Sequence, residues 1–251
     1  MHEHASARNT LAQMIGDGDL EGLLHEAEAL HGHRCPMLAL GVKAGQYAIN
    51  YLYPPHHAHG HGHSHGHGHG HSHGPGPGEV VALLEGVNCF VDGIQLVTGC
   101  TLGNNGLVVQ DLGKTAVTVA RRLDGAAVRL AVRADFREQM LARYPAAAPL
   151  FEKVVLRQEA APEERHRFQH LWEAIARREL AVPLEEQFVV QHLTIKPPDT
   201  RPNMATVVCS RCGEGVLAAK AKLKDGQNLC PGCAGESYLL LSGRGFESCA
   251  G

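Results

Sequence analysis

The stretch VVALLEGVNCFVDGIQLVTGCTLGNNGLVVQDLGKTAVTVARRLDGAAVRLAVRA, residues 80–134, decides the fold. It begins with an apolar run that predicts a buried strand, continues with a short helix, and ends with three β-rich runs separated by Gly and Asp turns. The connections between the last three runs are too short for parallel crossovers. We therefore expect an α+β core in which helices pack on one face of a mixed, mostly antiparallel sheet. The strand, the helix and the three runs are expected at 80–86, 90–99, 106–113, 115–122 and 126–134.

Two amphipathic helices are expected before this stretch. The first covers 20–31, where apolar residues recur at helical spacing and Asp17 or Asp19 can serve as the N-cap. The second begins at Pro36, which suits a first helical position, and ends near Tyr53. The expected order of the core is therefore two helices, one strand, one helix and three strands.

The remaining chain predicts a helical extension and a small separate module. Residues 135–180 have a helical pattern, and FVVQHLTIK at 188–196 indicates one more strand. KPPDTRP at 196–202 has the composition of a linker. We expect an α+β core over 1–195 and a cysteine-bearing module over 203–251.

The composition points toward metal binding. Among 251 residues, 44% are hydrophobic and 20% are charged, and no run approaches the roughly 20 apolar residues of a membrane span. The net charge of -3 argues against a protein that coats nucleic acid. Residues 1–16 lack the features of a secretory signal, so a cytoplasmic protein with reduced thiols is expected. The 18 His and 8 Cys are metal-ligating types.

Four cysteines near the C-terminus have the spacing of a structural zinc site. Two CxxC pairs are separated by 17 residues, which matches the pattern of a four-cysteine zinc ribbon. Four thiolates leave no open position on Zn²⁺, so this metal should fold the module without catalysis. A redox CxxC pair or two disulfides are weaker alternatives. Residues 201–251 carry six Lys/Arg against four Asp/Glu, too mild a bias to predict nucleic-acid binding. The four ligands are Cys209, Cys212, Cys230 and Cys233.

The segment HGHRCP predicts a second metal site. His31, His33 and Cys35 alternate, so an extended backbone would point all three side chains to one side. Pro36 keeps Cys35 at the N-terminus of the second helix, where the helix dipole should favour the thiolate. The alternative is a helix end with two solvated histidines and a buried cysteine.

Cys89 and Cys100 are further candidates for this core site. Both flank the short helix at 90–99, and either could approach HGHRC. Asp92 and Gln95 share a face of that helix and could orient a metal-bound histidine. Ordinary burial of the two cysteines as small apolar residues is the alternative.

Residues 56–78 form a histidine-rich insertion that lacks apolar side chains and is expected to be disordered. Its imidazoles could bind Ni²⁺, Cu²⁺, Zn²⁺ or Co²⁺ as a labile buffer, with affinity lost below about pH 6.5. An inert spacer is the alternative. The ten histidines are His56, His57, His59, His61, His63, His65, His67, His69, His71 and His73.

HGHRCP followed by LALG, then CFVDGIQLVTGCTLGNNGLVVQDLGKTAVTV, and finally CSRCGE with CPGC resemble the FmdE family, named after the E component of formylmethanofuran dehydrogenase. The resemblance is strong over 25–135 except for the histidine insertion, which departs from the family core, is weak over 136–200, and returns in the zinc module. It implies an α+β core, a metal site near HGHRC, a treble-clef-like or ribbon zinc module, and a homodimer. The positions that match are His31, His33, Cys35, Cys89, Asp92, Gln95, Cys100 and Lys114.

These patterns predict a cytoplasmic metalloprotein with structural Zn²⁺ and a second transition metal, Zn²⁺, Ni²⁺ or Fe²⁺, in the core. Its expected role is accessory to one-carbon or molybdopterin-type redox enzymes, or metal handling for a receiving protein. A metal- and thiolate-dependent enzyme for a small substrate is the main alternative, and a nucleic-acid-binding regulator is a third. Candidate catalytic residues are Cys35, Cys100, Asp92, Gln95 and Lys114.

Overall fold

The computed structural model describes residues 7–54, 75–76, 78–201 and 203–250. The predicted histidine buffer at 56–73 lies outside the described residues. None of the helices in the described ranges combines the length and the apolarity that a membrane span needs.

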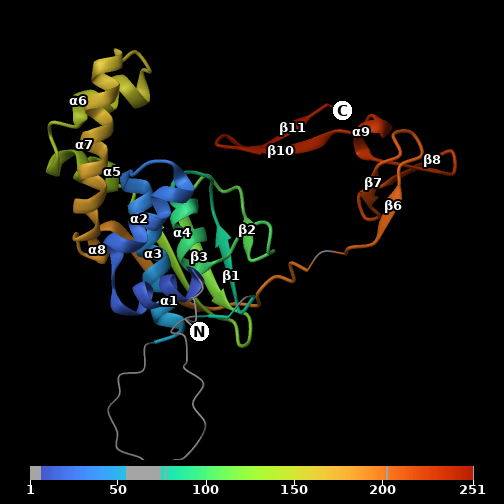
Figure 1. Cartoon of the computed structure of the whole chain (residues 1–251), viewed down its shortest axis with the longest axis horizontal. Coiled ribbons are helices and arrows are strands. Elements are labelled where there is room, and N and C mark those ends of the chain that lie inside the picture. Colours follow the sequence, from blue (N-terminus) through green and yellow to red (C-terminus); the bar gives the residue numbers. More distant parts are fainter. Residues whose placement is uncertain (1–6, 55–74, 77, 202, 251) are drawn as a thin grey trace, which may run out of the picture.

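A five-stranded mixed sheet lies at the centre of the core, as predicted (Figure 1). β1 pairs antiparallel with β3, which continues through β4 to β5. On its other edge β1 pairs in parallel with β2, because α4 (Phe90–Thr98) returns the chain to the same end of the sheet. The three β-rich runs are therefore not consecutive neighbours, since β1 separates β2 from β3. The sheet order is β2 (Leu107–Val109), β1 (Val80–Leu84), β3 (Ala116–Arg121), β4 (Ala126–Val132) and β5 (Phe188–Thr194).

α3 (Pro36–Leu52) and α4 form the helical layer that packs on the sheet. Leu40 and Ile94 of these helices join Val117, Val119 and Leu130 of the sheet in the largest buried apolar cluster. α2 (Leu20–His31) covers α3 and is preceded by Asp19, whose carboxylate caps the helix by accepting a hydrogen bond from the Gly22 N–H. Both predicted helices are thus confirmed, and the core is covered mainly from one side.

α3 and α4 meet backbone to backbone through two glycines. A Cβ atom on Gly41 would lie 2.2 Å from the carbonyl oxygen of Phe90, and one on Gly93 would lie 2.5 Å from the backbone nitrogen of Val42. Real side chains cannot approach backbone atoms so closely, so only glycine fits at either position. This contact fixes the N-terminal ends of α3 and α4 beside each other.

α1 (Ala7–Asp17) is a helix that the sequence patterns did not predict. Ile15 buries its side chain with residues of α2 and α3. Arg8 donates hydrogen bonds to the carbonyl oxygens of Leu96 and Val97, at 2.6 and 2.7 Å. These bonds satisfy carbonyl groups at the C-terminal end of α4, where the helix itself offers no donor.

The helical extension rises beside the core and includes one π-helical turn (Figure 1). Its base is fixed by the buried Glu179, whose carboxylate accepts hydrogen bonds from Arg143 and from the Gln187 side-chain nitrogen. The oxygen of the same Gln187 amide accepts a hydrogen bond from Lys43 of α3, which ties the extension to the core. The extension and the turn to β5 contain α5 (Phe136–Arg143), α6 (Ala148–Phe151), the π-helix η1 (Glu152–Leu156), α7 (Pro162–Leu180) and α8 (Leu184–Gln187).

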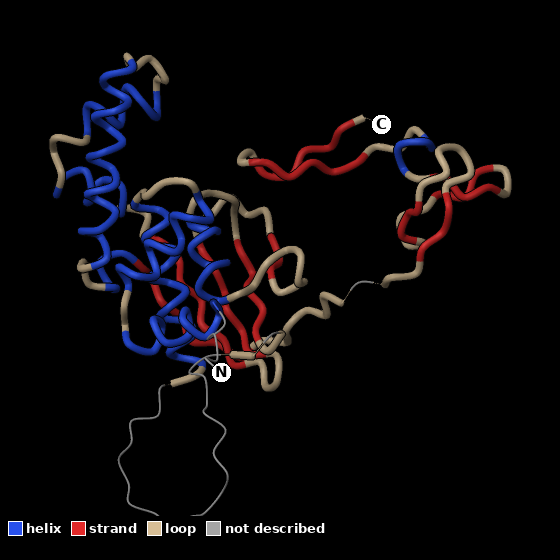
Figure 2. The backbone as a smooth tube through the Cα atoms, in the orientation of Figure 1, coloured by secondary structure: helices blue, strands red, loops and turns tan. Residues whose placement is uncertain are grey.

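The C-terminal residues form three antiparallel hairpins and one short helix (Figure 2). The described residues between β5 and this module, 195–201 and 203–205, contain no helix or strand and lie in the region of the predicted linker. The elements are β6 (Thr206–Val208), β7 (Gly215–Leu217), β8 (Lys222–Lys224), β9 (Gln227–Leu229), α9 (Pro231–Ala234), β10 (Tyr238–Ser242) and β11 (Gly245–Cys249).

Candidate metal centres

The core cluster forms where α2 ends and α3 begins. Gly32 ends α2 in the left-handed conformation, with φ 88°, and turns the chain so that His31 and His33 come together. Their ring centroids are 4.5 Å apart. Cys35 is the N-cap of α3, and its sulfur accepts a hydrogen bond from the Leu38 N–H. One donor atom from each of the three residues lies within 4.8 Å of the others.

Asp92 of α4 fixes the orientation of the His31 ring. The Nδ1 atom of His31 lies 2.7 Å from Oδ2 of Asp92, and the other carboxylate oxygen accepts a hydrogen bond from Gln95 Nε2 at 2.9 Å. The second ring nitrogen, Nε2, is buried and has no hydrogen-bond partner among the described residues. A histidine that donates Nδ1–H to a carboxylate presents a lone pair on Nε2, which is the usual arrangement of a metal ligand. A metal ion would therefore satisfy an otherwise unpaired atom.

Cys89, which directly precedes α4, extends the cluster. Its thiol interacts with that of Cys35 and lies near the His31 ring, without a hydrogen bond to the buried Nε2 of His31. The bond from Cys35, followed by the nearby His31, lowers the pKa of the Cys89 thiol to about 6. The same bond and burial raise the pKa of Cys35. The expectation that Cys35 is the favoured thiolate is therefore wrong for the metal-free site, because the hydrogen bond to Cys89 outweighs the position at the helix N-terminus.

Alkylation of the metal-free protein should consequently occur at Cys89. The rate should rise with pH through about 6, the pKa at which this thiol ionises, and level off near neutrality. Cys35 and Cys100 are only 2% exposed and should react far more slowly. Peptide mass spectrometry after iodoacetamide treatment over a pH series measures each site. Faster labelling of Cys35 than of Cys89 would contradict this assignment.

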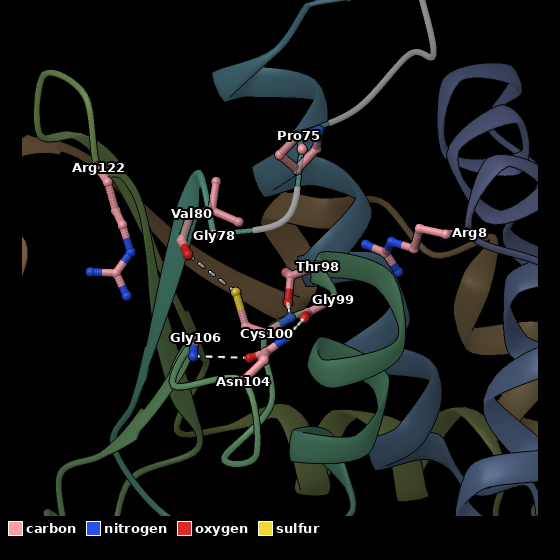
Figure 3. A pocket seen from close by; sticks show the side chains of 11 residues that line it. Arg8, Pro75, Gly78, Val80, Thr98, Gly99, Cys100, Asn104, Gly106 and Arg122 are labelled. Carbon is pink, nitrogen blue, oxygen red and sulfur yellow. Dashed lines mark hydrogen bonds between the residues drawn. The ribbon is translucent and has the colours of Figure 1, made fainter. Parts of the chain in front are cut away.

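Cys100 and Lys114 do not join the cluster. Cys100 lies beyond the opposite end of α4 from Cys89, so about 14 Å of helix separates them. Its sulfur points toward the carbonyl oxygen of Val80, at 3.7 Å, in a pocket of ≈ 240 Å³ flanked by Arg8 and Arg122 (Figure 3). Lys114 is exposed and lines a different pocket. The predicted place of Cys100 beside HGHRC is therefore wrong.

The core cluster opens into a cleft of ≈ 640 Å³. His33, Cys35 and Cys89 line it together with residues of the helical extension. The sequence patterns did not reveal this wall, since Phe168 and Trp172 fit a helical core pattern. The apolar residues within LFEKVVL, residues 150–156, were a usable signal because that pattern assigned them no partner. The apolar lining residues from the extension are Phe151, Val154, Val155, Phe168 and Trp172.

The four C-terminal cysteines come together as predicted, with their sulfur atoms within 4.8 Å of one another. The backbone N–H of Cys230 donates to the sulfur of Cys209, at 3.3 Å. Hydrogen bonds from the backbone of Cys212 and Cys230 lower the pKa of Cys209 to about 6. Thiolates stabilised by backbone N–H groups are suited to zinc. Cys249 lies in β11 and is not part of this cluster.

Comparison with known proteins identifies the family. The model of FmdE, described as "Molybdenum formylmethanofuran dehydrogenase operon", matches residues 30–189. The chain belongs to the FmdE family. The matched residues include the whole core cluster and both walls of the cleft. Together with the group of four C-terminal cysteines, the core cluster supports a metal-binding protein of the FmdE type.

This FmdE chain is also similar to one curated protein and to one solved structure. A protein of Archaeoglobus fulgidus named probable S-adenosyl-L-methionine-binding protein is 38% identical over 227 residues, or 90% of this chain and 56% of that protein. The chain thus spans little more than half the length of that relative. The crystal structure of a tungsten formylmethanofuran dehydrogenase FmdE-like protein from Syntrophus aciditrophicus has a TM-score of 0.50 and 18% identity. The match covers 86% of this chain and 92% of that chain, which shows the fold.

Proposed function

We propose that this FmdE protein holds one transition metal ion, Zn²⁺, Ni²⁺ or Fe²⁺, at His31, His33 and Cys35, with Cys89 as a fourth donor. The observation that carries the proposal is the buried, unpartnered Nε2 of His31, whose ring is fixed by Asp92. Imidazole and thiolate donors suit these borderline metals better than Ca²⁺ or Mg²⁺. A second ion, structural Zn²⁺, would be held by the four C-terminal cysteines.

The role that we propose is accessory to one-carbon or molybdopterin-type redox enzymes, or metal handling for a receiving protein. The family description, which refers to the operon of molybdenum formylmethanofuran dehydrogenase, supports the first form of this role. The homodimer and the redox or metal-receiving partner are parts of the same proposal.

Metal analysis of a His31→Ala variant tests the core site. Residues 56–74 are deleted in every protein compared, so that the histidine tract does not add metal. The parent should contain two metal ions per chain, and His31→Ala should contain one, because it loses the core ion and keeps the zinc of the C-terminal cysteines. His170→Ala, which removes an exposed histidine of α7, should retain both ions. Two ions in His31→Ala would refute the core site.

A metal-dependent enzyme is the second candidate function, and the cleft favours it. The side chains of His33, Cys35 and Cys89 face a space large enough for a small substrate. A metal held there could polarise a bound substrate, and Cys89 would supply a thiolate near neutral pH. The catalytic part assigned to Cys100 is not supported, because that thiol points into another pocket.

A further inference from the structure

We propose that the cleft beside the core cluster binds a small organic anion with an apolar, aromatic-type body. This inference deepens the proposed function by naming the ligand class of the same site. It depends on the wall that the helical extension adds to the cleft, and that wall requires no metal to form.

The size of the cleft favours a small molecule. Its volume of ≈ 640 Å³ lies within the range of about 300–1,000 Å³ that is typical of small-molecule sites. The core cluster lines one part of the cleft, where His33, Cys35 and Cys89 would face a bound molecule. A protein segment would instead need a long open groove.

Aromatic rings dominate the wall from the extension. Phe168 stacks on Trp172 with ring centroids 4.7 Å apart, and Phe151 approaches Trp172 at 5.5 Å. Val154 and Val155 of η1 face the same space, and Val155 leaves 42% of its surface exposed. A ring or branched aliphatic group would cover these side chains and gain the free energy of apolar burial.

The charged residues that line the cleft favour an anionic ligand. The residues that line the cleft include two arginines and no aspartate or glutamate. Arg34 is already paired with Glu28, at 2.7 Å, and with Glu21, at 3.4 Å. Arg165 uses its Nε–H for the carbonyl oxygen of Ala160, and no carboxylate of the described residues forms an ion pair with it. The terminal nitrogens of Arg165 would therefore bind a carboxylate or a similar group of the ligand.

A pair of dyes that differ by one charge tests this ligand class. Anilinonaphthalene sulfonate is an apolar aromatic anion, and phenylnaphthylamine is its uncharged counterpart. Trp172 is the only tryptophan and lies in the wall of the cleft, so a dye bound in the cleft must quench its emission, and the arginine variants below identify the binding site. We expect both dyes to quench Trp172 emission in the full-length protein, with tighter binding of the anion.

Variants of two neighbouring arginines distinguish a direct contact between Arg165 and the dye from an effect of the overall charge of the helix. Arg165→Gln should weaken binding of the anionic dye roughly tenfold, as expected for loss of a charge-assisted hydrogen bond. Binding of the neutral dye should change by less than about twofold. Arg165→Lys should restore part of the affinity. Arg167→Gln removes an exposed charge from the same helix outside the cleft lining and should change neither dye.

Three results would overturn the proposal. They are equal weakening by Arg165→Gln and Arg167→Gln, the absence of energy transfer from Trp172, and loss of dye sites as protein concentration rises, which would mean that a second copy covers the cleft. The Arg165→Gln variant separates this test from that of the metal site. Made in the protein that lacks residues 56–74, it should keep the parent's two metal ions per chain while it binds the anionic dye more weakly, so a failed metal site and a failed ligand site give different results.

Discussion

The Cys230→Ser variant is expected to lose the C-terminal zinc ion and to unfold the module over 203–250. Within this range, Cys209 and Ala234 are the apolar residues that the structure buries, so the module has almost no core of its own. Its hairpins have three to five residues per strand, and such isolated hairpins are marginal in water. In zinc-finger peptides the metal contributes about 10–16 kcal/mol to folding. Removing one of four thiolates should thus remove most of the stability of the module.

Zinc content, together with limited proteolysis, measures this effect. Zinc should fall by one ion per chain, and cleavage should begin within 203–250 while the α+β core remains intact. Cys249→Ser is the matched control, because Cys249 belongs to the same module but lies outside the cluster. An unchanged zinc content in Cys230→Ser would mean that the four sulfurs do not form the site.

The Gly93→Ala variant is expected to destabilise the core and to disrupt the core cluster together. The added methyl group would meet the backbone nitrogen of Val42 at 2.5 Å and the carbonyl oxygen of Leu38 at 2.7 Å. Backbone atoms of a buried helix cannot move aside cheaply, so α4 must shift away from α3. We expect a loss of about 3 kcal/mol of stability, or roughly 10 °C in the melting temperature, although alanine is the better helix former. Cys89 and Asp92 would move with α4 and weaken metal binding.

Gly103→Ala provides the control for this comparison. A Cβ at Gly103 would meet nothing closer than Thr101 Oγ1, at 3.9 Å. Thermal unfolding and metal analysis of the two variants should therefore separate the close helix contact from a general effect of replacing glycine. A Gly93→Ala protein with the parent's melting temperature would contradict the close packing of α3 and α4.

The sequence predicts the type of most core elements but not how they pair. Turn residues and apolar runs mark β1, β3 and β4, and Pro36 marks the start of α3. The pairing of β2 with β1 depends on the crossover through α4, which local patterns do not contain. α1 escaped prediction because its apolar stripe is short, with Leu11, Met14 and Ile15 as its only large apolar residues, and Ile15 alone is buried.

The candidate sites show the same limit. The spacing of His31, His33 and Cys35 is local, so their meeting could be predicted from the sequence, but a left-handed turn at Gly32 and not an extended backbone brings them together. Cys89 and Cys100 flank α4 symmetrically in sequence, and only the packing of α4 on α3 decides that Cys89 is the one near Cys35. The wall of the cleft could not be predicted because it is built by long-range packing of the extension on the core.

The π-helical turn η1 has an evolutionary consequence. A π-turn contains one more residue than the α-helical turn it replaces, and such turns are frequent at functional sites. Deleting one residue from 152–156 would rotate the side chains before it by about 100° relative to those after it. Val154 and Val155 would then leave the cleft while His31, His33 and Cys35 stayed in place. FmdE proteins that keep the same His/Cys cluster could in this way acquire differently shaped clefts through single-residue insertions and deletions.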